Sequence, residues 1–293
     1  MKIVLGVDHE HFWNAVDLLK RLKFEPATID AVHVVEGFGA ASLPSRSASR
    51  LPIHHVNQHL ETQGRSKLDK AVESLRHFGY PVETAILHGH ASKAILEYAG
   101  TQRADLIALG SPPKSSFVAN MYGSVSKAVV TSAERSVLIA KNKRDKQDPV
   151  RAIFATDHSD YCQRCAEKLI EMNPVGIEEI TVLTASRIDM DLLKSALPGI
   201  QHDFDDVEAA ITEEIEEANE KIAQQFANAG LRAKSVFVRT EFHEAVETAM
   251  RDQKADLLIM GAKGKGFWDR IRLGSNTLHQ ALNTSNDLLV LRN

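Results

Sequence analysis

The sequence has few of the features that mark secreted or membrane proteins. Its 293 residues include only two cysteines, Cys162 and Cys165, which are too few for a disulfide framework. No run approaches the roughly 20 apolar residues that a membrane-spanning helix needs. The first residues, MKIVLGVDHEHFW, do not read as a signal peptide, because an acidic residue follows a very short apolar run. We therefore expect a cytoplasmic protein with no membrane partner.

The chain also lacks an excess of charge of one sign. It has 35 Lys and Arg against 39 Asp and Glu, a net charge of −4, so no general attraction to nucleic acid or anionic lipid is expected. Hydrophobic residues make up 43% and charged residues 25%, which is typical of a globular protein. The length exceeds what one core needs and suits two domains of ordinary size.

What the sequence does contain is an internal repeat. The segment ADLIALGS at residues 104–111 recurs as ADLLIMGA at residues 255–262, 151 positions later. Other pairs of segments extend the match: Gly123-Ser124 with Gly274-Ser275, SVLIAKN (136–142) with DLLVLRN (287–293), and, at an offset of 149, KIVLGVDH (2–9) with RAIFATDH (151–158). The repeat predicts two domains, residues 1–143 and 149–293, joined by a charged linker that begins at residue 141 and ends in proline.

Each copy alternates short apolar strands with amphipathic helices. In the first copy we expect strands at residues 3–7, 29–35, 82–87, 106–109 and 137–140, a long helix at 56–78 and a mobile surface loop at 37–52. The second copy repeats this order, and its long helix carries an apolar stripe formed by Val207, Ile211, Ile215, Ala218, Ile222 and Phe226. Strands that are apolar throughout are typical of parallel sheets covered on both faces, so an α/β fold with two tandem doubly wound domains is predicted.

The most informative segment is GAKGKGFWDRIRLGSN, residues 261–276. It follows an apolar strand at 257–260 and precedes a helix expected at 277–282. Ligands of open parallel sheets bind beyond the carboxyl ends of the strands. A glycine-rich loop at that place can bring backbone N–H groups onto phosphate oxygens, and the N-terminus of the following helix favours an anion. Ser275 is expected to cap that helix. The residues expected to meet phosphate are Gly261, Lys263, Gly264, Lys265, Gly266, Gly274 and Ser275.

The spacing excludes two other phosphate loops. Phe267-Trp268 stands where a Walker loop requires Lys-Ser or Lys-Thr, and the G-x-G-x-x-G spacing of dinucleotide-binding loops is absent. The glycines could instead serve only as turns. The whole arrangement, G-x2-G-x9-G-S directly after a strand, favours a phosphate loop over turns alone.

This arrangement resembles the ATP-binding signature of the universal stress protein family, G-x2-G-x9-G-(S/T), and Asp157 within ATDHS is similar to that family's first motif. The resemblance covers nearly the whole chain, counted as two copies. It implies a five-stranded parallel sheet in each copy, with the copies paired through their last strands as a pseudo-dimer. It also implies ATP, ADP or AMP as ligand, with Mg²⁺ as an open question. Adenine and ribose would lie near Asp157, Ala185, Met260 and Gly261, and phosphates on Gly264, Gly274, Ser275 and Asn276.

The first copy departs from this pattern in the segment GSPPKSSFVANMYGSV, residues 110–125. Pro113 stands where the second glycine belongs, and proline removes a backbone donor and fixes φ. Lys114, Ser115 and Ser116 would have to compensate. We therefore expect one binding copy and one degenerate copy. The corresponding positions of the degenerate site are Asp8, Val34, Gly110, Pro113, Gly123, Ser124 and Val125.

Two other groups of residues suggest different chemistry. Cys162-Gln-Arg-Cys165 follows a strand and enters a helix, with Arg164 close by, but the aromatic-Cys and Gly-Pro context of redox motifs is missing. Histidines are frequent in the first copy, and some could converge near the strand ends and bind a metal. Their spacing, however, matches no metal-binding pattern; they are His9, His11, His54, His55, His59, His88 and His90. A G-x-S-x-G elbow is absent.

The sequence thus favours a stress-response protein that binds an adenine nucleotide in its second domain and acts as a nucleotide-dependent sensor or regulator towards a protein partner. Strong catalysis is not indicated, and slow ATP hydrolysis would use Asp157 as the metal or water contact. One alternative is an ATP-independent dimerisation scaffold. Another is a thiol redox protein using Cys162 and Cys165. Pairing of whole chains as a homodimer stays open.

Overall fold

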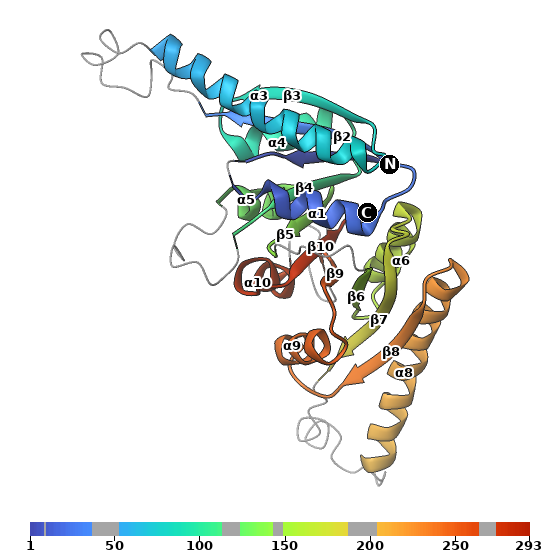
Figure 1. The fold of residues 1–293 in the computed structure, drawn as a ribbon. Helices are drawn as coiled ribbons and strands as arrows, with labels where there is room; N and C mark the ends of the chain where they lie inside the picture. The colour runs from blue at the N-terminus through green and yellow to red at the C-terminus, as the bar shows by residue number, and fades with distance from the viewer. Residues whose placement is uncertain (9, 37–52, 113–123, 143–148, 187–203, 264–273) are drawn as a thin grey trace, which may run out of the picture.

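The structure, a computed structural model, describes residues 1–8, 10–36, 53–112, 124–142, 149–186, 204–263 and 274–293 (Figure 1). The loop expected at 37–52 lies outside these residues. The first domain contributes the strands β1 (Lys2–Gly6), β2 (Thr28–Val35), β3 (Val82–His88), β4 (Leu106–Gly110) and β5 (Ser136–Ala140). The second contributes β6 (Val150–Ala155), β7 (Ile177–Ala185), β8 (Ala233–Val238), β9 (Leu257–Gly261) and β10 (Asp287–Leu291).

These strands form one ten-stranded sheet in the order β3-β2-β1-β4-β5-β10-β9-β6-β7-β8. Neighbours within each domain are parallel. The last strands of the two domains pair antiparallel, with Leu289 opposite Leu138. The expected pair of doubly wound α/β domains joined as a pseudo-dimer is therefore confirmed. The two five-stranded sheets continue into each other as a single mixed sheet.

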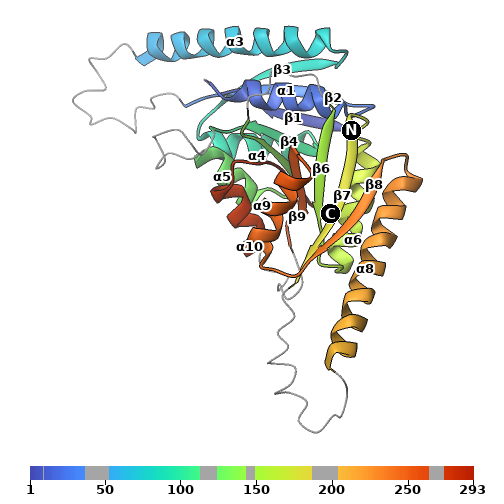
Figure 2. The ribbon, with the colours of Figure 1, turned by 60° about the horizontal axis from the view of Figure 1, so that its bottom comes forward.

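Helices cover both faces of this sheet (Figure 2). One face packs against α1 (Phe12–Leu22), α3 (Ile53–His77), α6 (Asp160–Met172) and α8 (Phe204–Asn228). The other packs against α4 (Ala91–Thr101), α5 (Ser124–Ser132) and α9 (Phe242–Asp252), and α10 (Ser275–Asn283) lies against α5, α9 and β10. Successive strand residues alternate between the two cores, as Leu289 and Val290 do. This double burial explains why the strands are apolar throughout. None of the described helices combines the length and the apolar character needed to cross a membrane.

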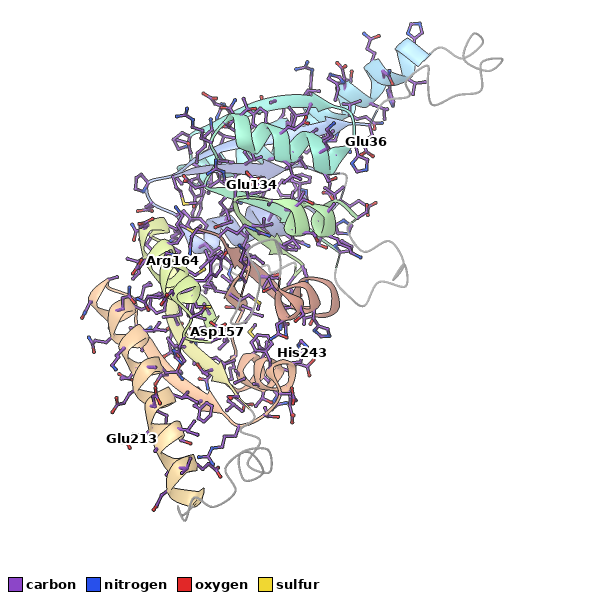
Figure 3. The ribbon with its side chains drawn as sticks, turned by 180° about the vertical axis from the view of Figure 1, so that it is seen from behind. Glu36, Glu134, Asp157, Arg164, Glu213 and His243 are labelled. Carbon is purple, nitrogen blue, oxygen red and sulfur yellow. The ribbon has the colours of Figure 1, made fainter. Side chains whose placement is uncertain are left out.

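The two longest helices, α3 and α8, extend beyond the sheet at its two outer ends (Figure 1). In α8 the apolar stripe is buried only towards the C-terminus, where Phe226 meets Phe154 edge-on with ring centroids 5.2 Å apart. Towards the N-terminus Ile211 and Ile215 are half-buried, and Glu213 lies on the projecting part (Figure 3). Burial on the sheet thus stabilises one half of the helix more than the other.

A second contact joins the domains where the segment after α1 meets the segment after α6. Phe24 and Pro174 form an isolated antiparallel bridge, and the Gly176 N–H donates to the Leu22 carbonyl at 2.9 Å. Gly176 must lack a side chain here, because a Cβ atom would lie 1.8 Å from the Arg21 carbonyl oxygen. Arg21 itself forms a buried ion pair with Asp256 at 3.0 Å. The two domains are therefore held together by side chains as well as by the sheet.

Candidate functional site

A cavity of about 270 Å³ opens in the second domain at the carboxyl ends of β6, β7 and β9. Strand β6 lies between β9 and β7, so the cavity sits where the connections of a doubly wound sheet diverge, the usual ligand position. Of the residues expected at this site, those lining the cavity are Asp157, Ala185, Met260, Gly261, Lys263, Gly274, Ser275 and Asn276. Gly264, Lys265 and Gly266 lie outside the described residues.

Asp157 follows the end of β6 and precedes α6 (Figure 3). Its Oδ1 atom accepts hydrogen bonds from the N–H and the hydroxyl of Ser159, at 3.0 and 2.7 Å. Ser159 is the N-cap of α6, and its hydroxyl oxygen accepts the Cys162 N–H at 3.2 Å. These bonds fix the Asp157 carboxylate at the mouth of the cavity, where it can accept hydrogen bonds from a ligand.

The start of α10 is fixed to the end of β9 by two hydrogen bonds. The Thr277 hydroxyl donates to the Gly261 carbonyl at 2.9 Å, and the Gly274 N–H donates to the Ala262 carbonyl at 2.7 Å. The expectation that Ser275 caps this helix is wrong. The helix begins at Ser275, and the N-cap is Gly274, which has extended backbone angles and no side chain to donate or accept. A hydroxyl already inside the first turn is poorly placed to accept an amide of that turn.

The anion-binding capacity of this helix therefore lies in its first turn. Helix α10 begins at Ser275, and the first N–H groups of an α-helix, here those of Ser275, Asn276 and Thr277, have no acceptor within the helix. They point out of the positive end of the helix dipole, and Ser275 and Asn276 are exposed. The Gly274 N–H, by contrast, is used by Ala262 and is not available to a ligand.

Sequence reasoning missed several residues around this site. Phe242, at the start of α9, and Cys162 line the cavity, as does Thr277. Tyr161 packs beneath Gly261, where an added Cβ would lie 3.0 Å from its ring, and its hydroxyl donates to the Leu291 carbonyl at 3.3 Å. Burial raises the pKa of Tyr161 to about 12, so the ring stays neutral. Only for Thr277 did the repeat offer a signal, since another hydroxyl residue, Ser126, stands 151 positions earlier. In the structure the Ser126 hydroxyl contacts the Gly110 carbonyl at 3.5 Å, as Thr277 contacts Gly261.

The two cysteines do not have the properties of a redox pair. Both lie in α6, and both are buried and reduced. Burial raises the pKa of Cys162 to about 11, and burial together with the neighbouring Cys162 raises that of Cys165 further above its ordinary value. The charge of Arg164 lowers the pKa of Cys165, but burial outweighs it. A redox centre needs the opposite shift, so these thiols argue against the redox interpretation.

The first domain has a cavity of about 380 Å³ at the equivalent position. Asp8, Val34, Gly110, Ser124 and Val125 line it, whereas Pro113 and Gly123 lie outside the described residues. Asp8 accepts the N–H groups of His11 and Phe12, at 2.8 and 2.7 Å, and so anchors the start of α1. The replacement of the loop glycine by proline has therefore left a cavity in place.

The described histidines do not gather at one point. His11 lies 3.4 Å from Asp8, His59 contacts Gln63 in its own helix, and His88 lies 3.7 Å from Glu61. Within the described part of the chain there is no group of three or more His, Cys, Asp or Glu side chains placed to hold a metal ion. His9 and the side chain of His54 fall outside it.

Fold and site together define a tandem doubly wound α/β protein with a cavity at the switch point of each half. The model of the universal stress protein family matches residues 1–141 and again residues 151–292. The chain belongs to the universal stress protein family and carries its domain twice.

Several known proteins are similar to this chain. A universal stress protein from Archaeoglobus fulgidus has a crystal structure similar over 99% of this chain and 98% of that chain, with a TM-score of 0.68 and 18% identity. A universal stress protein of Methanocaldococcus jannaschii is 26% identical over 131 residues, which cover 45% of this chain and 73% of that protein. A family member from Arabidopsis thaliana was crystallised with AMP bound; it covers 51% of this chain and 95% of its own, at 20% identity and a TM-score of 0.37.

Proposed function

We propose that the second domain binds an adenine nucleotide and that its occupancy regulates contacts with a protein partner. One observation carries this proposal. Asp157 and Gly261, from the ends of two strands, and the first turn of α10 converge on one cavity. A carboxylate, a glycine that admits close approach, and a helix N-terminus are together suited to a ligand with both hydroxyl and phosphate groups.

Each part of the cavity suits one part of such a ligand. The base would lie against Ala185, Met260 and the ring of Phe242, which form an apolar wall. Ribose hydroxyls would donate to Asp157. Phosphates would reach the N–H groups of the first turn of α10 and the ammonium group of Lys263. At about 270 Å³ the cavity is slightly smaller than the usual ligand pocket of about 300–1,000 Å³, so terminal phosphates would extend towards solvent.

Binding rather than rapid catalysis is the activity that this geometry supports. Asp157 is the one carboxylate lining the cavity among the described residues. A single carboxylate can help to hold Mg²⁺ with phosphate oxygens, but it leaves no second group to act as a general base. Slow ATP hydrolysis is the most that we propose.

The test compares the two copies by the same change. Isothermal titration calorimetry with ATP, ADP and AMP should give one site per chain, and released nucleotide can be sought by chromatography after denaturation. The double variant Gly274→Val, Ser275→Ala should lose this binding. The matched variant Gly123→Val, Ser124→Ala in the first domain should keep it. Absence of binding by the wild-type chain at millimolar nucleotide would contradict the proposal.

The second candidate function is an ATP-independent scaffold. The continuous β5–β10 pairing and the buried Arg21–Asp256 ion pair favour it, since both give a rigid unit without a ligand. If partner binding by the Gly274→Val, Ser275→Ala variant equals that of the wild type, the scaffold function is supported and nucleotide control is not.

A further inference from the structure

Two buried cations lie at equivalent places in the two domains. Lys141 follows β5 and Arg292 follows β10, 151 positions apart in the sequence. Lys141 is 2% exposed and Arg292 is 8% exposed. The sequence placed Lys141 at the start of a charged linker, where a solvated side chain is the rule. The structure instead buries it between the domains, and a buried ammonium group requires partners.

The Lys141 side chain reaches partners in the other domain. Its Nζ atom donates to the carbonyl oxygens of Gln280 and Thr284, at 3.2 and 2.8 Å. These carbonyls lie in and just beyond the last turn of α10, where carbonyls receive no N–H from the helix itself; the Gln280 carbonyl also accepts the Thr284 hydroxyl at 2.9 Å. The backbone N–H of Lys141 donates to Asp287 at the start of β10, at 2.7 Å. A cation of the first domain thus caps the C-terminus of a helix in the second.

Arg292 makes the reciprocal contact. Its Nη2 atom donates at 2.6 Å to the carbonyl of Val130, in the last turn of α5. Its backbone N–H donates at 3.1 Å to the Ser136 hydroxyl at the start of β5. Helices α5 and α10 also pack against each other across the pseudo-twofold axis. Each domain therefore supplies the cation that satisfies the negative end of the other domain's last helix.

This arrangement bears directly on the candidate site. Helix α10 has 9 residues, and isolated helices shorter than about 12 residues are marginal in water. Its N-terminal end is held within its own domain by Thr277 and Gly274. Its C-terminal end is held by Lys141. The order of the first-turn N–H groups, and hence their readiness for phosphate, depends on both attachments.

We propose that Lys141 of the first domain is a positioning residue for phosphate binding by α10 of the second domain. This inference rests on the proposed nucleotide site. It gives the degenerate copy a role in that site: the copy does not contact phosphate there, but it fixes the far end of the helix that does.

The first measurement needs no nucleotide. Hydrogen–deuterium exchange of the α10 amides should be faster in Lys141→Met by about tenfold, while α5 is unchanged. Arg292→Met should show the opposite pattern, with faster exchange in α5 and no change in α10. Lys141→Arg, which keeps the charge and the donors, should behave as the wild type. Unchanged exchange of α10 in Lys141→Met, or an equal rise in both helices, overturns the proposal.

The second measurement separates the contribution of the phosphates to binding from that of the base. In calorimetric titrations, Lys141→Met should weaken ATP binding by about twofold to fivefold and leave adenosine binding unchanged. Equal weakening of ATP and adenosine would mean a general loss of structure and would overturn the phosphate role. Wild-type protein that binds no ATP refutes the proposed function, and the exchange measurement still decides whether Lys141 fixes α10. Should Lys141→Met fail to fold, Lys141→Gln, which keeps N–H donors without charge, takes both measurements.

Discussion

Phe242 and Ala91 stand 151 positions apart and line the two cavities at the same place, the first residue of a helix. The aromatic ring fills space that alanine leaves open, which fits the volumes of about 270 and 380 Å³. A second difference between the two domains concerns the residues at positions 33 and 184. His33 fills the first domain beneath Gly64, where a Cβ atom would lie 2.3 Å from the imidazole ring. At the position equivalent to His33, Thr184 donates instead to Asn219 at 2.7 Å.

We predict that Phe242→Ala weakens the binding of ATP and of adenosine alike, by about 1–3 kcal/mol, because a flat ring that stacks on a base is lost. Equal effects on the two ligands would distinguish this change from Lys141→Met. Phe242→Leu should lose less, and calorimetry measures each. Unaltered adenosine affinity in Phe242→Ala would place the base elsewhere in the cavity.

Tyr80 predicts how stability responds to alkali. Its hydroxyl donates to the Leu19 carbonyl at 3.1 Å and accepts the Phe24 N–H at 3.0 Å. Burial raises its pKa from 10.0 to about 12, so the folded state resists ionisation. The unfolded chain therefore releases this proton first, and the free energy of unfolding should fall as the pH rises from about 10 towards 12.

Urea unfolding at several pH values between 8 and 11 measures this fall. Tyr98 and Tyr161, whose pKa values are also raised to about 12, contribute in the same direction. In Tyr80→Phe the dependence on pH should be shallower, although the variant is less stable at neutral pH by about 1–3 kcal/mol, because the Phe24 N–H loses its partner. An equally steep dependence in Tyr80→Phe would remove Tyr80 from this account.

At the scale of elements, the junction between β9 and α10 determines the site. The strand ends at Gly261 and the helix begins at Ser275, and a buried hydroxyl from Thr277 connects the two. The corresponding contact of Ser126 in the first domain is long, at 3.5 Å. The start of α10 is therefore more firmly attached to β9 than the start of α5 is to β4.

We predict that Thr277→Val, which keeps the shape of the side chain, lowers ATP affinity and costs about 1 kcal/mol of stability. Ser126→Ala is the matched control and should leave ATP affinity unchanged. Calorimetry and urea unfolding of the two variants provide the comparison. Equal losses in both would mean that the hydroxyl serves the fold alone.

The elements differ in how far the sequence predicts them. Apolar runs locate the strands because burial on both faces allows few polar residues, and the long helix expected at 56–78 is found at Ile53–His77. The start of α10 could not be placed, since a glycine can be an N-cap as readily as the serine beside it. Phe242 and Lys141 were missed because their positions depend on contacts between distant segments. The nucleotide itself stays a prediction.

At the scale of the whole molecule, the domains share one sheet and a buried ion pair. Arg21 and Asp256 are both nearly enclosed, with side chains 6% and 8% exposed, and the Arg151 N–H also donates to the Asp256 carboxylate at 3.2 Å. Such a pair is costly to break from one side, because the remaining charge stays buried.

We predict that Arg21→Met destabilises the protein by about 3–5 kcal/mol. The double variant Arg21→Met, Asp256→Leu should recover part of this loss, because no unpaired charge remains. Urea unfolding followed by circular dichroism measures both. A loss below about 1 kcal/mol in the single variant would show that solvent reaches Asp256 in the folded protein.

The antiparallel pairing of β5 with β10 occurs within one polypeptide. Two separate subunits joined in this way would fall apart on dilution, but here the tether keeps the halves at a fixed effective concentration. The unfolding midpoint should accordingly not depend on how much protein is present. A dimer of identical subunits must also carry every substitution on both sides. In the fused chain the loop glycine can give way to Pro113 in one half while Gly264 persists in the other, so each half is free to specialise.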